Sequence, residues 1–459
     1  MQELDRAISE HKRVHFIGAG GIMMSALALE LQRQGAYVTG ADRSESERVS
    51  MLRKAGIPVT IGHFAETVEG ASVVVRNAAI HDDSPDIVAA RALGIPIIER
   101  PTLLGLLMRG YDKRLCFAGT HGKSTTSAMA AQALLTAKKE PTAFLGAVLP
   151  EIGGSYTLGK NEFFVAESCE YCDSFLELFP QTAVILNISE DHLDYFSGIE
   201  QIISSFRRFA LLALNANGVA VVNGEDENVL AAVKGLPGRI VTFGLTKGDY
   251  QAADLSFDRG YASFTLLQKG KPLGKITLQI PGRHSVYNAL ACAAALLENG
   301  LSPAETVEGI SSFAGVARRF QKLGTYNGAI VIDDYAHHPQ ELAATLRSAK
   351  NMAFERVICL FQPHTYTRTK AFMAEFAKAL SLADLALVTD IYAARELPIP
   401  GVSANELAKL VPDSLYTPSL TEAAEALKSL AKPGDCILVC GAGNVNEAAY
   451  ALTNEEKEM

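Results

Sequence analysis

Short apolar runs alternate with amphipathic stretches along most of the chain. Near the N-terminus the strand-like run RVHFIG (13–18) precedes a glycine-rich turn and a helical pattern that ends at Gly35. A second strand-like run, AYVTGAD, ends at Asp42, and further strand and helix patterns follow as far as PTLLGLLMRG (101–110). Strands that alternate with helices at this spacing predict a parallel sheet. We therefore expect a Rossmann-like first domain over residues 1–108.

A second unit begins with the apolar run LCFA (115–118), the turn GTHGKSTT (119–126) and a helical pattern. A strand, a glycine-rich turn and a helix in this order form a phosphate cradle, because backbone N–H groups and the positive helix end point at the anion. Lys123 can reach the outer phosphates, and the Ser124 hydroxyl can bind Mg²⁺. The full P-loop pattern has another glycine where Phe117 stands, so this turn is a compact variant. A tight strand-to-helix connection without a ligand is the alternative.

The glycine-rich turn of the first domain is a weaker signal. Gly18 and Gly20 fit the start of a GxGxxG pattern, but Met23 replaces the third glycine. Asp42 lies at the distance along the chain where an acidic residue can meet a ribose hydroxyl. NAD, another nucleotide and a purely structural turn all remain open for this position.

Polar side chains follow strand-like runs in the second unit, which we expect to span residues 109–313. The run EFFVA leads to Glu167, and TAVILNIS leads through Asn187 to His192. Ligand groups of open α/β sheets collect at the carboxyl ends of the strands, so Glu167 and His192 are suited to a metal shell beside a nucleotide. A buried ion pair or a capping box would also account for either residue singly.

The end of the second unit combines β structure with a helix. Residues 239–279 are expected to form irregular β structure with turns. The segment PGRHSVYNALACAAALLENG (281–300) is expected to enter a helix. His284 and Asn288 are four residues apart there, so they share a helical face that can contact a flat ligand such as a base.

Residues 314–459 repeat the strand and helix alternation and predict a third domain. Polar residues again follow strands: Asp333, Asp334, His337 and His338 after one run, and Gln362, His364 and Arg368 after the next. Two adjacent histidines are compatible with a transition-metal site. No third ligand is spaced to match them, so contact with a substrate or nucleotide is the favoured interpretation.

Composition narrows the function classes. The net charge of −9 and the lack of clustered Lys and Arg argue against nucleic-acid binding. No apolar run reaches the length of about 18 residues that spans a bilayer, and the first residues are too polar for a signal peptide, so we expect a cytoplasmic protein with no membrane contact. Seven cysteines fit a reducing compartment. Cys169 and Cys172 form a CEYC spacing, whereas Cys436 and Cys440 flank a run typical of a buried strand, which argues against a four-cysteine zinc site.

Six motifs occur in one order over nearly the whole chain: GTHGKSTT, NISEDHLDYF, HSVYNALA, ARRFQ, DDYAHHP and FQPHTYTRT. Together they closely resemble the Mur ligases of bacterial cell-wall synthesis. The resemblance implies an α/β fold of three domains: a Rossmann-like UDP-sugar domain, a central P-loop ATPase domain with a parallel sheet, and a Rossmann-like C-terminal domain. It implies ATP and Mg²⁺ as cofactors, UDP-N-acetylmuramate and L-alanine as substrates, and an acyl-phosphate intermediate.

The resemblance also assigns roles by position. The residues implied around the nucleotide and its metal are Gly119, Thr120, His121, Gly122, Lys123, Ser124, Thr125, Glu167, His192, His284, Asn288, Arg319 and Asp334. Among these, Ser124, Glu167 and His192 would surround Mg²⁺, and Lys123, Glu167, His192 and Arg319 are implied in catalysis. The catalytic pair His337 and Arg368, with His338, would face the amino acid and the reacting carboxylate. The UDP-sugar would meet Gly18, Gly20, Gly21, Asp42 and His63.

Three departures from the family pattern bear on these assignments. Met23 and Thr365 stand where Gly and Arg are usual, and ESCEYCD replaces the commoner EADESD. Two other functions compete: a sister ligase that attaches a peptide to the same sugar nucleotide, and an ATP-binding regulator without catalysis. We expect a monomer or a weak homodimer.

Overall fold

The computed structural model describes residues 6–7, 10–77, 79–193, 195–394 and 396–458. Three separate sheets succeed one another along the chain, with five, ten and six strands. The predicted three-domain α/β fold is confirmed by these sheets. The predicted boundaries after residues 108 and 313 fall between the sheets and stay predictions, and the predicted start at residue 1 lies outside the described residues.

The first sheet has the order β3-β2-β1-β4-β5, and all its pairs are parallel. Its strands are β1 (Arg13–Ile17), β2 (Tyr37–Asp42), β3 (Val59–Ile61), β4 (Val73–Arg76) and β5 (Ile97–Glu99). The helices between them are α2 (Ile22–Arg33), α3 (Glu47–Lys54), the 3₁₀ turn η1 (Ala65–Val68) and α4 (Pro85–Ala92), and α5 (Arg100–Met108) follows β5. The strand order reverses between β1 and β4, which is where open α/β sheets bind ligands.

The second sheet has the order β15-β14-β13-β12-β11-β10-β6-β9-β7-β8. Its strands are β6 (Lys113–Ala118), β7 (Thr142–Leu149), β8 (Gly154–Thr157), β9 (Phe163–Glu167), β10 (Thr182–Ile185), β11 (Val219–Asn223), β12 (Arg239–Gly244), β13 (Tyr250–Asp258), β14 (Tyr261–Gln268) and β15 (Lys271–Pro281). Its helices are α6 (Lys123–Thr136), η2 (Pro150–Ile152), η3 (Tyr171–Glu177), α7 (Ile199–Asn215), α8 (Glu227–Val233), α9 (Arg283–Glu298) and α10 (Pro303–Ser311). In the order of the sheet, every pair between β13 and β7 is parallel, as predicted. Antiparallel strands extend both edges: β14 and β15 beyond β13, and β8 beyond β7.

Residues 239–279 lie in four strands and the turns between them, so the predicted β structure with turns is confirmed, and register shifts interrupt the pairing of β13 with β14 and of β14 with β15. Two-residue turns join β13 to β14 and β14 to β15. In both turns the central residues have positive φ: 43° at Arg259 and 83° at Gly260, then 48° at Lys269 and 76° at Gly270. Turns of this hand match the twist of the flanking strands, and glycine at the second position removes the steric cost.

The third sheet has the order β16-β17-β21-β18-β19-β20, and only the β16–β17 pair is antiparallel. Its strands are β16 (Gln321–Tyr326), β17 (Ala329–Asp334), β18 (Val357–Phe361), β19 (Leu385–Thr389), β20 (Leu415–Thr417) and β21 (Cys436–Cys440). Its helices are α11 (Pro339–Lys350), α12 (Tyr366–Ala371), α13 (Met373–Leu380), α14 (Ala404–Lys409), α15 (Leu420–Leu430) and α16 (Asn446–Glu458). The run between Cys436 and Cys440 is a buried central strand, as predicted.

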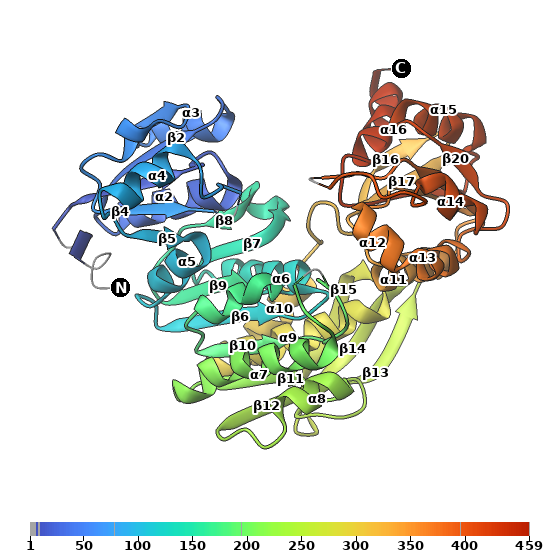
Figure 1. The fold of residues 1–459 in the computed structure, drawn as a ribbon. Helices are drawn as coiled ribbons and strands as arrows, with labels where there is room; N and C mark the ends of the chain where they lie inside the picture. The colour runs from blue at the N-terminus through green and yellow to red at the C-terminus, as the bar shows by residue number, and fades with distance from the viewer. Residues whose placement is uncertain (1–5, 8–9, 78, 194, 395, 459) are drawn as a thin grey trace.

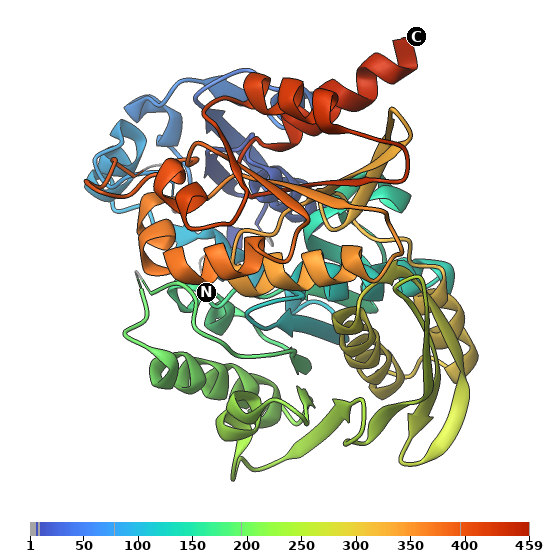
Figure 2. The same cartoon turned by 90° about the vertical axis from the view of Figure 1, so that its right-hand side faces the viewer.

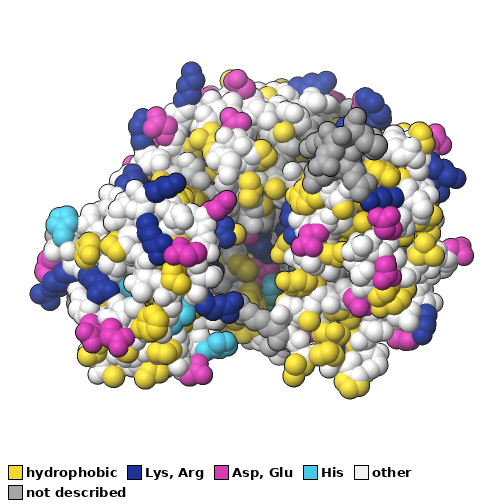
Figure 3. Space-filling model, turned by 90° about the horizontal axis from the view of Figure 1, so that it is seen from above, with side chains coloured by type: hydrophobic (Ala, Val, Ile, Leu, Met, Phe, Trp, Pro, Cys, Tyr) yellow, Lys and Arg dark blue, Asp and Glu magenta, His cyan; other side chains and the backbone are white. Residues whose placement is uncertain are grey.

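The first and third domains stand on the same side of the second and apart from each other (Figure 1). Figure 2 shows the third domain from its outer side, above the yellow-green strands β13 to β15. Seen from above, the molecule is hollowed between the two upper domains (Figure 3). In the part of the chain that the structure describes, no helix is both long and apolar enough to cross a membrane.

A buried polar contact fixes the first domain to the second. Glu30 of α2 is fully buried, and the Tyr111 hydroxyl donates to its Oε1 over 2.8 Å. Arg33 donates to the other Glu30 oxygen over 2.8 Å and to the Tyr111 hydroxyl over 2.7 Å. The same hydroxyl lies 3.0 Å from Oγ1 of Thr142 in the second domain. Apolar side chains of both domains continue around this contact as one core.

Candidate active site

The glycine-rich turn of the second domain connects β6 to α6 and is held by the neighbouring strand β10. Asn187, two residues beyond β10, accepts from the His121 N–H over 2.8 Å and donates to the His121 carbonyl over 3.0 Å. Its carbonyl also accepts from the Thr120 N–H over 3.1 Å. Gly122 caps α6 with a φ of 85°. The turn is thus rigid, and the N–H groups of the first turn of α6 face outward as an anion site.

Lys123 meets a carboxylate that the sequence analysis did not single out. Its Nζ lies 3.0 Å from Oε2 of Glu170 and donates to the Thr120 carbonyl over 3.1 Å. Burial alone would lower the pKa of Lys123, but the negative charge of Glu170 raises it above its ordinary value. Both side chains are almost fully buried, so the cation of the phosphate loop is already paired before any phosphate arrives. Glu170 lies within ESCEYCD, and its position three residues after Glu167 was the only local signal.

Glu167 and Ser124 offer oxygen atoms beside the loop. Glu167 ends β9, and its Oε2 is buried without a hydrogen-bond partner among the described residues. Gly146 in β7 makes room for it, because a Cβ there would lie 2.0 Å from that oxygen. Mg²⁺ prefers hard oxygen ligands, so an unpartnered carboxylate oxygen and a loop hydroxyl fit it. No described residues form a group of three His, Cys, Asp or Glu side chains suited to a metal, but Mg²⁺ on a nucleotide needs only one or two protein ligands.

His192 has surroundings of its own. It has a positive φ of 54°, its Nε2 lies 3.9 Å from Asp191 Oδ2, and its ring lies 4.7 Å from the Tyr171 ring. Asp191 in turn lies 3.4 Å from Nη2 of Arg368 in the third domain. The structure therefore shows His192 within a chain of contacts that leads to Arg368.

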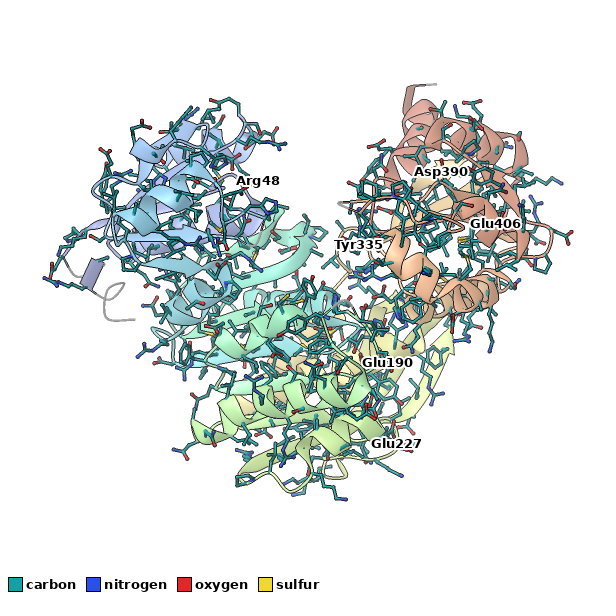
Figure 4. All side chains as sticks on the ribbon, viewed as in Figure 1. Arg48, Glu190, Glu227, Tyr335, Asp390 and Glu406 are labelled. Carbon is teal, nitrogen blue, oxygen red and sulfur yellow. The ribbon has the colours of Figure 1, made fainter. Side chains whose placement is uncertain are left out.

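A cavity of about 360 Å³ lies between the second and third domains. It brings together these residues predicted around the nucleotide: His121, Gly122, Ser124, Thr125, His284, Asn288, Arg319 and Asp334. Figure 4 shows Tyr335 close to this junction, on the side of the third domain that faces the second. The predicted residues Gly119, Thr120, Lys123, Glu167 and His192 do not line the cavity wall.

Asp334 is buried in the wall of this cavity, and His284, an exposed residue, also lines it. The two oxygens of Asp334 accept from the backbone N–H groups of Ala336 over 2.8 Å and Phe320 over 2.7 Å. Burial raises the pKa of Asp334 to about 6, whereas desolvation by the surrounding protein atoms, together with His121 and Arg319, lowers the pKa of His284 to about 4. Near neutral pH the wall therefore carries an ionised carboxylate and an uncharged imidazole.

His337, His338 and Arg368 lie beside the phosphate loop, outside the cavity wall. The His338 ring is 5.3 Å from the His121 ring, and the His337 ring is 5.9 Å from the His364 ring. Burial lowers the pKa of His337 and of His338 to about 4, so both are uncharged near neutral pH. Arg368 contacts Nδ1 of His364 at 3.4 Å.

Glu341 of α11 is the second charged residue that the sequence analysis missed. It lines the cavity, and its Oε1 lies 3.2 Å from Nδ1 of His121 and 3.8 Å from Nη1 of Arg319. The contact with His121 spans 220 residues of sequence. No local pattern reports such a pairing.

The predicted UDP-sugar residues lie in the first domain, away from this cavity. The Gly20 N–H donates to Asp42 Oδ2 over 2.8 Å, and Nε of Arg48 donates to the Gly20 carbonyl over 2.8 Å. Figure 4 shows Arg48 on the side of the first domain that faces the third. His63 lies 2.7 Å from the buried carboxylate of Asp86. Gly18 has a φ of 74°, and Met23 packs against the core.

These features define a class: an α/β protein in which a phosphate-loop domain stands between two Rossmann-like domains. Residues 13–112 match the family profile "Mur ligase family, catalytic domain", 117–296 match "Mur ligase middle domain", and 318–443 match "Mur ligase, glutamate ligase domain". The chain belongs to the Mur ligase family, as the six motifs predicted.

Known relatives match along their full length. A UDP-N-acetylmuramate--L-alanine ligase of Caldanaerobacter subterraneus subsp. tengcongensis is 45% identical over 98% of this chain and 99% of its own. One of Agathobacter rectalis is 42% identical over 96% and 97%. The crystal structure of a UDP-N-acetylmuramate-alanine ligase from Thermotoga maritima is 31% identical, with a TM-score of 0.79 over 98% of this chain and 100% of that one.

Proposed function

We propose that this enzyme joins L-alanine to the lactyl carboxylate of UDP-N-acetylmuramate at the expense of ATP, in the synthesis of peptidoglycan precursors. The observation that carries the proposal is the cavity that combines the phosphate loop of the second domain with Arg319 and Asp334 of the third. The choice of substrates is supported by the full-length similarity to L-alanine ligases, at 45% identity for the Caldanaerobacter enzyme.

The proposed reaction has two steps. A lactyl carboxylate oxygen attacks the γ-phosphorus of ATP, and ADP leaves, which gives an acyl phosphate. The amine of L-alanine then attacks the acyl carbon and gives up a proton, and phosphate leaves as the amide bond forms. Phosphoryl transfer of this kind depends mainly on positioning and on charge stabilisation, which cations and aligned N–H groups supply.

The nucleotide is assigned to the cavity. Lys123, Arg319 and the N–H groups of the loop would hold the phosphates, since they are the cations and donors around the start of α6. His284 and Asn288 would contact the adenine, and Asp334 the ribose. The oxygens of Asp334 each accept one backbone N–H and keep a lone pair for a ribose hydroxyl.

Ser124 and Glu167 would hold Mg²⁺, with His192 as the third predicted ligand. The buried, unpartnered Oε2 of Glu167 supports this assignment. When bound, Mg²⁺ neutralises charge that develops on the transferring phosphoryl group.

The remaining assignments place the two other substrates. Arg368 is the cation among these three residues, so it would bind a carboxylate. The uncharged imidazoles of His337 and His338 would form hydrogen bonds with the amino acid. The UDP-sugar would meet Gly18, Gly20, Gly21, Asp42 and His63 in the first domain. We further propose that the reaction takes place in the cytoplasm and that the protein is a monomer or a weak homodimer.

Phosphate release measured with ATP, UDP-N-acetylmuramate and single amino acids tests the function. We expect release to require both the sugar nucleotide and L-alanine. ATP hydrolysis that is indifferent to both substrates would contradict the proposal.

Two other functions predict different outcomes in the same assay. A peptide-attaching ligase would release phosphate with a tripeptide and not with L-alanine. A regulator without catalysis would bind ATP and release no phosphate. The presence of Lys123, Glu167, His192, Arg319 and Asp334 favours catalysis.

A further inference from the structure

One carboxylate, that of Glu341, joins the second and third domains at the cavity wall. It belongs to α11 of the third domain, and it lies 3.2 Å from Nδ1 of His121 in the phosphate loop. On the same side it lies 3.8 Å from Nη1 of Arg319. Its side chain is only 14% exposed, so these contacts are partly shielded from bulk solvent.

Glu341 is charged in this place. Burial alone would raise its pKa, but the neighbouring His337, His121 and Arg319 hold that pKa well below the ordinary value. His337 is itself uncharged near neutral pH, because burial lowers its pKa to about 4. The permanent cation beside Glu341 is therefore Arg319, whose charge is partly neutralised before any nucleotide arrives.

The same carboxylate also caps α11. Its Oε2 accepts from the backbone N–H groups of His337 over 3.2 Å and His338 over 3.4 Å. The two histidines precede the first turn of α11 and lie beside the phosphate loop. A displacement of Glu341 thus changes the start of α11 and the two imidazoles together.

We propose that Glu341 is a positioning residue that occupies the place of a nucleotide phosphate between His121 and Arg319, and links filling of the cavity to the placement of His337 and His338. This inference rests on the proposed function, because it takes a nucleoside di- or triphosphate as the incoming anion. The phosphate repels the carboxylate and competes with it for Arg319. Glu341 then keeps its bonds to the start of α11 and gives up its contacts with His121 and Arg319.

A purely structural role as a helix cap makes a different prediction, and the chain offers a matched control. Glu305 is the capping carboxylate of α10, at the same position relative to its helix start as Glu341. It accepts from the Ser302 N–H over 2.8 Å and lies 4.0 Å from Lys139, away from the cavity. Glu305→Gln therefore removes a cap without changing the charge around the nucleotide.

The test is calorimetric titration with ADP and Mg²⁺, combined with steady-state kinetics. In Glu341→Gln we expect the Kd of ADP to fall about three- to tenfold because the repulsion is gone, while kcat falls because the histidines lose their anchor. Glu305→Gln should leave both unchanged. Unchanged or weaker ADP binding by a folded Glu341→Gln protein would overturn the inference.

A second variant covers the case in which Glu341→Gln does not fold. Glu341→Asp keeps the charge but withdraws it from Arg319 by one methylene, so its Kd for ADP should lie between those of the parent and a protein without the charge. Weaker ADP binding than in the parent would again overturn the inference. A parent protein that binds no ADP would instead contradict the proposed function, so the two failures are distinguishable.

Discussion

At the scale of single residues, Glu167 presents an unusual atom, a buried carboxylate oxygen without a hydrogen-bond partner among the described residues. If it binds Mg²⁺, Glu167→Gln should lower kcat by about a hundredfold or more while the affinity for ATP changes little, because charge stabilisation is lost mainly in the transition state. Raised Mg²⁺ should partly restore the rate. Glu162→Gln, directly before the same strand, is the control.

His192→Ala should have a similar effect if His192 is a ligand of the same ion. A Glu167→Gln enzyme that turns over at the parent rate across a Mg²⁺ titration would refute the metal assignment. A defect of His192→Ala that Mg²⁺ does not relieve would place His192 with Asp191 and Arg368, which it adjoins in the structure.

The titration of Asp334 should contribute to the pH dependence of the free energy of unfolding. Burial raises the pKa of Asp334 in the folded protein from 3.8 to about 6, so between these pH values the native state holds a proton that the unfolded state has lost. The contribution of Asp334 to the free energy of unfolding therefore falls as the pH rises from about 4 to 6. Burial lowers the pKa of His337 and of His338 from 6.5 to about 4, so their contribution to the free energy of unfolding rises over nearly the same range. The two histidines outweigh the one carboxyl group, so net stability should increase towards pH 6.5.

Asp334→Asn should make that increase steeper, by at most one proton or about 1.4 kcal/mol per pH unit. Urea unfolding at pH 4.5, 5.5 and 6.5 measures the slope, and the exposed Asp258→Asn is the control. Equal slopes in the parent and in Asp334→Asn would mean that Asp334 does not titrate in this range.

Local sequence identified Lys123 and Asp334, and it missed the carboxylates of Glu170 and Glu341. Lys123 begins α6 after the glycine-rich turn and Asp334 ends β17, so both belong to patterns of adjacent residues. Glu170 and Glu341 act through partners 47 and 220 residues away, respectively. A pairing at such separations depends on the packing of whole domains, so a carboxylate three residues after Glu167 or His338 is indistinguishable from a surface charge or a helix cap.

At the scale of elements, the hairpins of β13 to β15 show how a turn fixes a sheet edge. The sequence analysis expected irregular β structure with turns here without resolving the strands. Register shifts do interrupt the strand pairing, one between Ala253 and Ser256 and another between Leu266 and Leu267. The dipeptides Arg259-Gly260 and Lys269-Gly270 were the missed signals.

Gly270 allows a direct test of that turn. Its φ is 76°, and a Cβ there would meet no atom within 4 Å, so substitution costs backbone strain alone. Gly270→Ala should lower the free energy of unfolding by about 1 kcal/mol, and Gly270→Asn by less, because asparagine tolerates this conformation better. Denaturant unfolding of both variants measures the difference. Two variants as stable as the parent would show that the turn takes another form in solution.

At the scale of the whole molecule, the arrangement of domains decides which predicted residues can meet. The second and third domains share the cavity and the contact between His121 and Glu341. The first domain is joined to the second through Glu30, Arg33 and Tyr111, and the molecule is hollowed between the first and third domains (Figure 3). The family resemblance implied a nucleotide shared by the second and third domains, because it placed Arg319 and Asp334 beside the phosphate loop. No motif includes the contact of the first domain with the second, which depends on buried groups such as Glu30 and Tyr111.

Tyr111→Phe should loosen the first domain specifically. It removes a hydroxyl that donates to the buried Glu30 and accepts from Arg33, at a cost of about 1–2 kcal/mol. Tyr250→Phe is the matched control, because its hydroxyl donates to Glu298 over 2.9 Å and accepts from Gln268, entirely within the second domain. Both variants should lose similar stability.

Only Tyr111→Phe should speed hydrogen exchange in α2, which carries Glu30 and Arg33 and adjoins the predicted UDP-sugar residues Gly20 and Gly21. Equal exchange of α2 in the two variants would show that the apolar core, and not this polar contact, holds the first domain in place.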